Sequence, residues 1–215
     1  MCENIFKKYQ NLFITSRPGM GATTLLVNII NERHKNGDKI LIFAPGDSVS
    51  DKFMDRIKVL NGEAKAEQIF PKSKHKYGNI TVIDNNFLDA RYIMNCVMEE
   101  DNDLIVIDES PCSKMSTREI VKLATQLKRF NRKFIFVTHL KRKISRITKK
   151  EINSPKVSHH RRAINCFDAT MIVYREEYYS SEERNDEIRI YEKGAKLLYS
   201  VNVTFDFNTQ QVKPL

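Results

Sequence analysis

The chain of 215 residues is long enough for one α/β domain, and 41% apolar residues suffice to build its core. Its net charge of +9, from 36 basic and 27 acidic residues, favours a polyanionic partner. It contains no run of about 18 apolar residues and no signal-peptide pattern, so neither a membrane span nor secretion is predicted. The widely spaced Cys2, Cys96, Cys112 and Cys166 indicate reduced thiols in a cytoplasmic protein, without disulfides or a zinc site.

Strands and helices are predicted to alternate along the first part of the chain. Residues 11–15 form a strand, and a helix runs from a glycine-rich turn to about His34. A short strand at 39–43 precedes a helix whose apolar residues extend from Val49 to Leu60. The polar and basic residues 63–78 are predicted to form a surface connection.

The alternation continues through the middle of the chain. Residues 80–83 and 104–107 are predicted strands, separated by an amphipathic helix over 88–99. Ser116 and Glu119 form a capping box, in which each side chain accepts a hydrogen bond from a free backbone N–H at the start of the next helix. The predicted buried face of that helix consists of Ile120, Leu123, Ala124, Leu127 and Phe130.

The last predicted strands lie at 134–137, 171–174, 188–191 and about 197–207. Continuous apolar strands between helices predict a mainly parallel sheet covered on both faces, and the alternating final strand predicts an antiparallel extension. Ligands of such sheets bind at the carboxyl ends of the strands. The chemically interesting residues all follow strand ends, namely the turn at 16–23, Gly46-Asp47, Asp108-Glu109 and Thr138-His139.

The turn reads Ser-Arg-Pro-Gly-Met-Gly-Ala-Thr-Thr over residues 16–24 and resembles a phosphate-binding loop without its lysine. In the pattern G-x-x-x-x-G-K-S/T, backbone N–H groups surround the phosphates and the lysine contacts the β and γ oxygens. Ala22 leaves the amides and the helix N-terminus to bind phosphate but removes a charge that stabilises phosphoryl transfer. The alternative is a glycine-rich turn without a ligand. The predicted ATP-binding residues are Arg17, Pro18, Gly19, Met20, Gly21, Ala22, Thr23 and Thr24.

Polar residues after the strands supply the predicted metal-binding and catalytic groups. Thr23, with Thr24 as its alternative, is predicted to bind Mg²⁺ together with Asp108, which follows four apolar residues as in a Walker B strand. Glu109 is the candidate that orients the attacking water, and His139 is a candidate sensor of the γ-phosphate. The alternatives are an acidic pair that caps a turn and a histidine with only local partners. Arg17 is a candidate to replace part of the missing lysine charge.

A strongly basic segment begins two residues after His139. Residues 141–150 hold six positive charges and no negative one, and further basic residues follow up to 162. Such a segment predicts nucleic-acid binding, and the alternative is a solvated basic loop. The candidate DNA-binding residues are Lys141, Arg142, Lys143, Arg146, Lys149, Lys150, Arg161 and Arg162.

These motifs together resemble the RecA-type motor domain of DnaB-family replicative helicases, from about residue 11 to residue 210. Residues 16–23 are similar to the family's A-R-P-x-M-G-K-T loop, and residues 103–108 to its D-L-I-V-I-D strand. Residues 138–142 correspond to S-Q-L-N-R, and residues 168–179 to the D-A-D…Y-R-D-E-Y-Y stretch. The resemblance implies an α/β RecA-like P-loop NTPase fold in one domain over 1–215, without an N-terminal collar domain. It also implies homo-hexameric rings that bind ATP between subunits and single-stranded DNA in the channel.

Three departures from the family affect its catalytic parts. Ala22 replaces the lysine, the family's catalytic glutamate corresponds to Gly46 with Asp47 one position away, and its final basic segment is reduced to Glu192-Lys193-Gly194. The sequence therefore predicts a divergent DnaB-like helicase-core protein of DNA replication in a phage or mobile element. It is expected to bind single-stranded DNA and a replicative helicase or other replication protein, and to bind ATP and Mg²⁺ weakly or not at all, with impaired or absent hydrolysis. The alternatives are a DNA-stimulated ATPase or helicase with Glu109 as base, and a terminase-like DNA-packaging ATPase.

Overall fold

The computed structural model of the protein describes residues 8–17, 19–44, 55–61, 74–84, 88–108, 114–139, 162–175, 186–192, 196–206, 209 and 211–214. The strands in these parts are β1 Asn11–Ser16, β2 Ile40–Phe43, β3 Lys74–Tyr77, β4 Ile80–Ile83, β5 Leu104–Ile107, β6 Lys133–His139, β7 Ala169–Arg175, β8 Asp186–Glu192, β9 Lys196–Asp206 and β10 Gln211–Pro214. The helices are α2 Ala22–Lys35, α4 Ala90–Glu99 and α6 Thr117–Arg129, with a 3₁₀ turn η4 at Ile164–Cys166.

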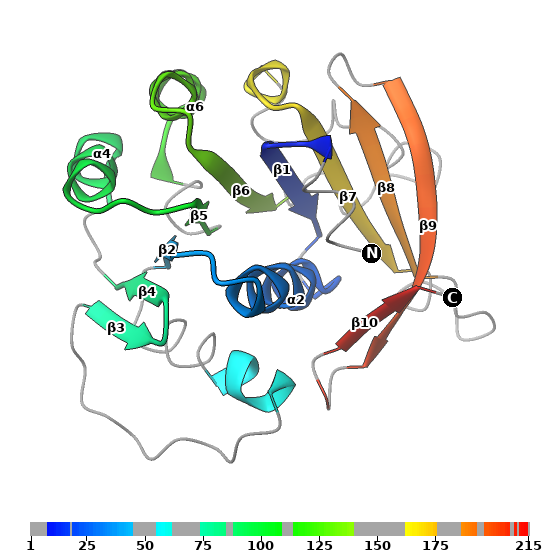
Figure 1. Cartoon of the computed structure of the whole chain (residues 1–215). Coiled ribbons are helices and arrows are strands. Elements are labelled where there is room, and N and C mark those ends of the chain that lie inside the picture. The colour runs from blue at the N-terminus through cyan, green and yellow to red at the C-terminus, as the bar shows by residue number, and fades with distance from the viewer. Residues whose placement is uncertain are drawn as a thin grey trace.

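The strands form one sheet in the order β10-β9-β8-β7-β1-β6-β5-β2-β4-β3 (Figure 1). The six strands from β7 to β4 run parallel to one another. β3 pairs antiparallel at one edge, and β8, β9 and β10 extend the other edge antiparallel. The predicted fold, a mainly parallel α/β sheet with an antiparallel C-terminal extension, is confirmed.

Helices cover both faces of the parallel part of the sheet. α4 and α6 lie on one face, and α2 lies on the other (Figure 1). Because side chains alternate along a strand, Leu12 and Ile14 of β1 join the apolar cluster of α2, and Phe13 joins that of α4 and α6. Burial on both faces explains why the parallel strands are almost entirely apolar.

Two predictions differ from the structure. Residues 74–77, predicted to lie in a surface connection, form β3 and pair with β4, because backbone hydrogen bonds at a sheet edge need no apolar side chains. Phe130, predicted to be buried, is 45% exposed. It is the C-cap of α6, so the helix ends before this residue can continue the buried face.

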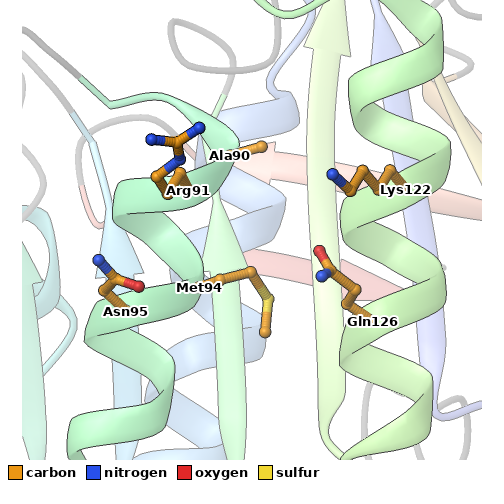
Figure 2. Close-up of a pocket in the computed structure, with 6 residues that line it drawn as sticks. All are labelled: Ala90, Arg91, Met94, Asn95, Lys122 and Gln126. Atoms are coloured by element: carbon orange, nitrogen blue, oxygen red, sulfur yellow. The ribbon is translucent and has the colours of Figure 1, made fainter.

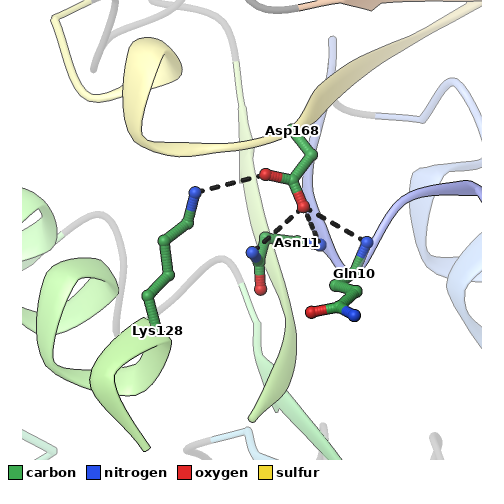
Figure 3. Close-up of polar contacts among 4 residues, drawn as sticks. All are labelled: Gln10, Asn11, Lys128 and Asp168. Atoms are coloured by element: carbon green, nitrogen blue, oxygen red, sulfur yellow. Dashed lines mark hydrogen bonds and ion pairs between the residues drawn. The ribbon is translucent and has the colours of Figure 1, made fainter. Parts of the chain in front are cut away.

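Asp168 forms polar contacts at the amino-terminal ends of β1 and β7 (Figure 3). Its Oδ2 accepts hydrogen bonds from the backbone N–H groups of Gln10 and Asn11, at 3.2 and 3.0 Å, and from Nδ2 of Asn11 at 3.0 Å. Its Oδ1 pairs with Nζ of Lys128 at 3.2 Å. One carboxylate therefore joins β1 and α6 to the start of β7, at the end of the sheet away from the predicted site.

Candidate nucleotide-binding site

The loop between β1 and α2 has the backbone of an anion-binding turn. Gly19 and Gly21 have φ angles of 82° and 88°, which glycine adopts without steric cost. The N–H of Met20 donates to the carbonyl of Arg17 at 3.2 Å and closes the turn. Gly21 is the N-cap of α2, and no side chain of the described residues caps the helix. Since the first N–H groups of a helix have no intrahelical partner, this loop and helix end suit a phosphate group.

The position that lysine occupies in related loops is packed into apolar surroundings. Ala22 is 3% exposed and belongs to the apolar cluster of α2, which also contains Phe205 of β9. A Cβ atom placed on Gly21 would lie 2.8 Å from Cε1 of Phe205. The C-terminal extension therefore covers the loop directly, and only a glycine fits beneath the Phe205 ring.

Asn28 makes a second link between the loop helix and the C-terminal extension. Its Nδ2 donates to the carbonyl of Thr24 at 2.8 Å, and its Oδ1 accepts from the N–H of Val212 at 3.2 Å. One amide thus joins the first turn of α2 to β10. Together with Phe205, it holds the extension against the phosphate loop.

Buried polar side chains lie beneath the loop at the carboxyl ends of the strands. Thr15 of β1 pairs in register with Thr138 of β6, and both are almost fully buried. The hydroxyls of Thr15 and Ser16 have no hydrogen-bond partner among the residues that the structure describes. A buried hydroxyl without a partner is costly, so this position suits a bound group that supplies one. The two hydroxyls could therefore form hydrogen bonds to a bound nucleotide or to a water molecule beside it.

The donors predicted for Mg²⁺ lie at the same edge of the sheet. Asp108 follows β5, is 6% exposed, and its N–H donates to the carbonyl of Phe43 at 3.0 Å. Thr23, in the first turn of α2, is half-buried, whereas Thr24 is 2% exposed. A carboxylate and an accessible hydroxyl suit Mg²⁺, which keeps several waters and binds substrate phosphates. The described residues contain no cluster of three or more acidic, histidine or cysteine side chains that would hold a metal by itself.

Arg56 is a site residue that sequence reasoning missed. It lies in the helical residues 55–60, which follow β2, and the fully buried Ile57 anchors this helix in the α2 cluster. Burial lowers the pKa of the Arg56 guanidinium, and the nearby Asp108 carboxylate acts in the opposite direction. A partly buried cation therefore lies within electrostatic range of the Asp108 carboxylate. The available signal was the place of Arg56 in the segment that follows the carboxyl end of β2 in the sequence.

The structure places the other predicted site residues as follows. Arg17, directly after β1, is 6% exposed, and Met20 is buried. His139 ends β6 opposite Ser16 in the strand register, and Arg162 is exposed in a turn before η4. The remaining predicted residues lie outside the described residues, and their roles stay predictions: Pro18, Asp47, Glu109, Lys141, Arg142, Lys143, Arg146, Lys149, Lys150 and Arg161.

The sheet order, the glycine-rich loop between β1 and α2 and the position of Asp108 after β5 define the fold class, a RecA-like α/β fold. The family model of the type III restriction enzyme res subunit, ResIII, matches residues 1–136, and the chain belongs to this family. No curated protein matches the sequence significantly.

Solved structures share the fold. One of them, an isolated ATPase domain, superposes with a TM-score of 0.74 at 15% identity, over 97% of this chain and 85% of that one. A DnaB-like replicative helicase, solved in work on its interactions with primase, gives 0.68 at 16% identity over 98% of this chain, which spans only 60% of the helicase. A KaiC-like protein, PH0186 of Pyrococcus horikoshii OT3, gives 0.64 at 13% identity over 98% and 94% of the two chains. The expected similarity to DnaB-type motor domains is thus confirmed for the fold.

Proposed function

We propose that this RecA-like domain binds ATP with Mg²⁺ at residues 16–24 and hydrolyses it poorly or not at all, while it binds single-stranded DNA in replication. The observation that carries the proposal is that Ala22 is buried at the start of α2, where Gly21 is the N-cap and makes no side-chain cap hydrogen bond. The helix end and glycine turn can bind phosphates, but no ammonium group follows Gly21. Binding is therefore retained more readily than catalysis.

In this proposal, backbone N–H groups of the loop hold the phosphates, and Thr23 and Asp108 hold Mg²⁺. When bound, Mg²⁺ neutralises negative charge on the β and γ phosphates. Ser16 donates its buried hydroxyl to the bound group or to its water. Loss of one preorganised group that stabilises transition-state charge typically lowers a rate by about 10²- to 10³-fold. Ala22 is expected to impose a loss of this order.

An active DNA-stimulated ATPase is the second candidate, and Arg56 favours it. The guanidinium lies within electrostatic range of Asp108 and so adds positive charge near the expected phosphates. In this alternative, Arg56 and Arg17 replace part of the lysine charge, and Glu109 orients the attacking water.

The proposed DNA contact rests on the basic segment that follows β6. β6 ends at the same edge of the sheet as the phosphate loop, since His139 pairs in register with Ser16. In this proposal, the segment, which starts two residues after His139 in the sequence, responds to the bound nucleotide. The names of the matched family and solved relatives, a restriction-enzyme subunit and a replicative helicase, agree with a nucleic-acid partner. Assembly into a homo-hexamer and contact with a replicative helicase belong to the same proposal.

Calorimetric titration with ATP and Mg²⁺ tests the nucleotide site. We expect weak binding that Asp108→Asn reduces and Ala22→Lys strengthens, without DNA-stimulated phosphate release by the unsubstituted protein. DNA-stimulated release that Glu109→Gln abolishes would establish the second candidate instead. If neither the unsubstituted protein nor Ala22→Lys binds ATP, the nucleotide proposal is wrong.

Salt-dependent binding to a single-stranded oligonucleotide tests the DNA contact. Neutralising Lys141, Arg142 and Lys143 should weaken binding and reduce the slope of log K against log salt concentration by about 2. A matched variant neutralises three exposed lysines elsewhere, Lys35, Lys76 and Lys213. Equal effects of the two triple variants would mean that the net charge, and not the segment, attracts the DNA.

A further inference from the structure

A groove runs between α4 and α6 on the face of the sheet opposite α2 (Figure 2). It has a volume of about 230 Å³ and no role in the nucleotide site proposed above. Side chains from both helices line it: Ala90, Arg91, Met94, Asn95, Lys122 and Gln126.

The lining combines positive charge with amide and apolar groups. Arg91 and Lys122 approach the groove from opposite helices (Figure 2). Asn95 and Gln126 lie one helical turn further on, and Met94 points between the helices. None of the six lining residues carries a carboxylate. The six lining side chains are therefore complementary to a negatively charged ligand that also has apolar parts, and the carboxylates of Asp89 and Glu119 lie at the N-terminal ends of the same two helices.

Two exposed apolar side chains continue the same helix faces. Met98 follows Met94 by four residues and is 60% exposed, and Phe130 follows Gln126 by four residues and is 45% exposed. Residues four apart lie one above the other on a helix face. Among the described residues, these two are the exposed large hydrophobic side chains. Arg91 and Lys122 thus form a basic end of the groove, and Met98 and Phe130 lie one helical turn beyond the lining residues Met94 and Gln126.

We propose that this groove binds a helical segment of a partner protein, with carboxylates on one turn and a large apolar side chain about two turns away. The rise from Arg91 to Met98 is about 10 Å, which equals about two turns of such a helix. An amphipathic helix placed in a groove between two helices is a common mode of peptide recognition. The basic end selects the orientation of the segment, and Met98 and Phe130 supply buried area.

Fluorescence anisotropy with labelled synthetic peptides tests the proposal. The probe is a helical peptide of about 16 residues with two glutamates on one turn and two leucines about two turns later. Expected is saturable binding that Arg91→Glu with Lys122→Glu weakens by about tenfold, with a loss of salt dependence. Replacing the peptide's glutamates by lysines should restore binding to this double variant. Met98→Ser should weaken binding at every salt concentration, and Lys76→Glu, an exposed lysine on β3, is the matched control without effect.

Each contrary outcome overturns the proposal. Absence of binding by the acidic peptide, or equal binding to the double variant, would remove the role of Arg91 and Lys122. Displacement of the peptide by a short oligonucleotide would identify the groove as a nucleic-acid site. Self-association of the protein that Met98→Ser abolishes, measured by sedimentation velocity, would make a second copy the occupant. Circular dichroism checks that the variants are folded, as expected for substitutions at exposed positions.

Discussion

Substitution of Gly21 by alanine tests the contact between β9 and the loop that joins β1 to α2. The new Cβ would lie 2.8 Å from Cε1 and 3.0 Å from Cδ1 of Phe205, closer than carbon atoms approach without displacement. Phe205 is only 8% exposed, so its ring cannot turn freely away. Gly21 also has a φ of 88°, which alanine adopts only with strain. Both effects destabilise the native state.

Gly37 offers a matched control at the other end of the same helix. Its φ of 89° is nearly equal to that of Gly21, but no atom of the described residues lies within 4 Å of the position its Cβ would take. Gly37→Ala therefore measures the backbone strain alone, about 1–2 kcal/mol. Gly21→Ala adds overpacking of about 1–3 kcal/mol to the same strain. In a domain of this size, each kcal/mol corresponds to about 2–4 °C in Tm.

Urea unfolding of the two variants, followed by circular dichroism, gives the required difference in free energy of unfolding. Phe205→Leu in the Gly21→Ala background should recover much of the additional loss, because the smaller side chain leaves room for the methyl group. A double-mutant cycle isolates this coupling from the cavity that leucine leaves by itself. Equal destabilisation by Gly21→Ala and Gly37→Ala, or additive effects in the cycle, would refute the reasoning.

Three further outcomes are expected. Asp168→Asn should lower the free energy of unfolding by about 1 kcal/mol, since the half-exposed carboxylate accepts three hydrogen bonds, and urea titration measures the loss; an unchanged midpoint would contradict its role. Ser116→Ala should cost about 1 kcal/mol at neutral pH. Hydrogen bonds from Ser116 lower the pKa of Glu119. The capping box therefore stabilises the folded state fully above the pKa of Glu119 in the unfolded chain, and less as the pH falls below it. If urea titrations at acidic pH show the same difference in free energy of unfolding between the unsubstituted protein and Ser116→Ala, this reasoning is wrong. Asn28→Ala should accelerate hydrogen exchange at the N–H of Val212, whereas Asn28→Asp, which retains the acceptor, should not.

The parallel part of the fold could be predicted because each of its strands is mainly apolar, as burial on both faces requires. The run Leu104–Ile107 is apolar throughout, as two covered faces require, and the structure has the strand at those residues. β3 and β10 were not predicted from the sequence. Edge strands such as Lys74–Tyr77 are held by backbone hydrogen bonds to a neighbouring strand and need no local pattern of apolar residues. Phe130 was assigned to the core because the helical period does not specify where the helix ends.

The candidate site was predictable only in its local parts. The loop at 16–24 and the carboxylate after β5 are short motifs, and both lie where the pattern predicts. The cover by Phe205, the link from Asn28 to Val212 and the proximity of Arg56 to Asp108 join distant segments. A local pattern carries no information about which distant side chain packs against it.

The cover supplied by Phe205 and Val212 has a consequence for the order in which the site is completed during synthesis. Residues 16–24 leave the ribosome early, but the residues that close over Gly21 and bind Asn28 follow about 180 positions later. Domains form from the N-terminus as the chain grows. A nascent chain therefore carries the loop sequence long before it has a stable loop. Protection of α2 from proteolysis should arise only after β9 and β10 have emerged.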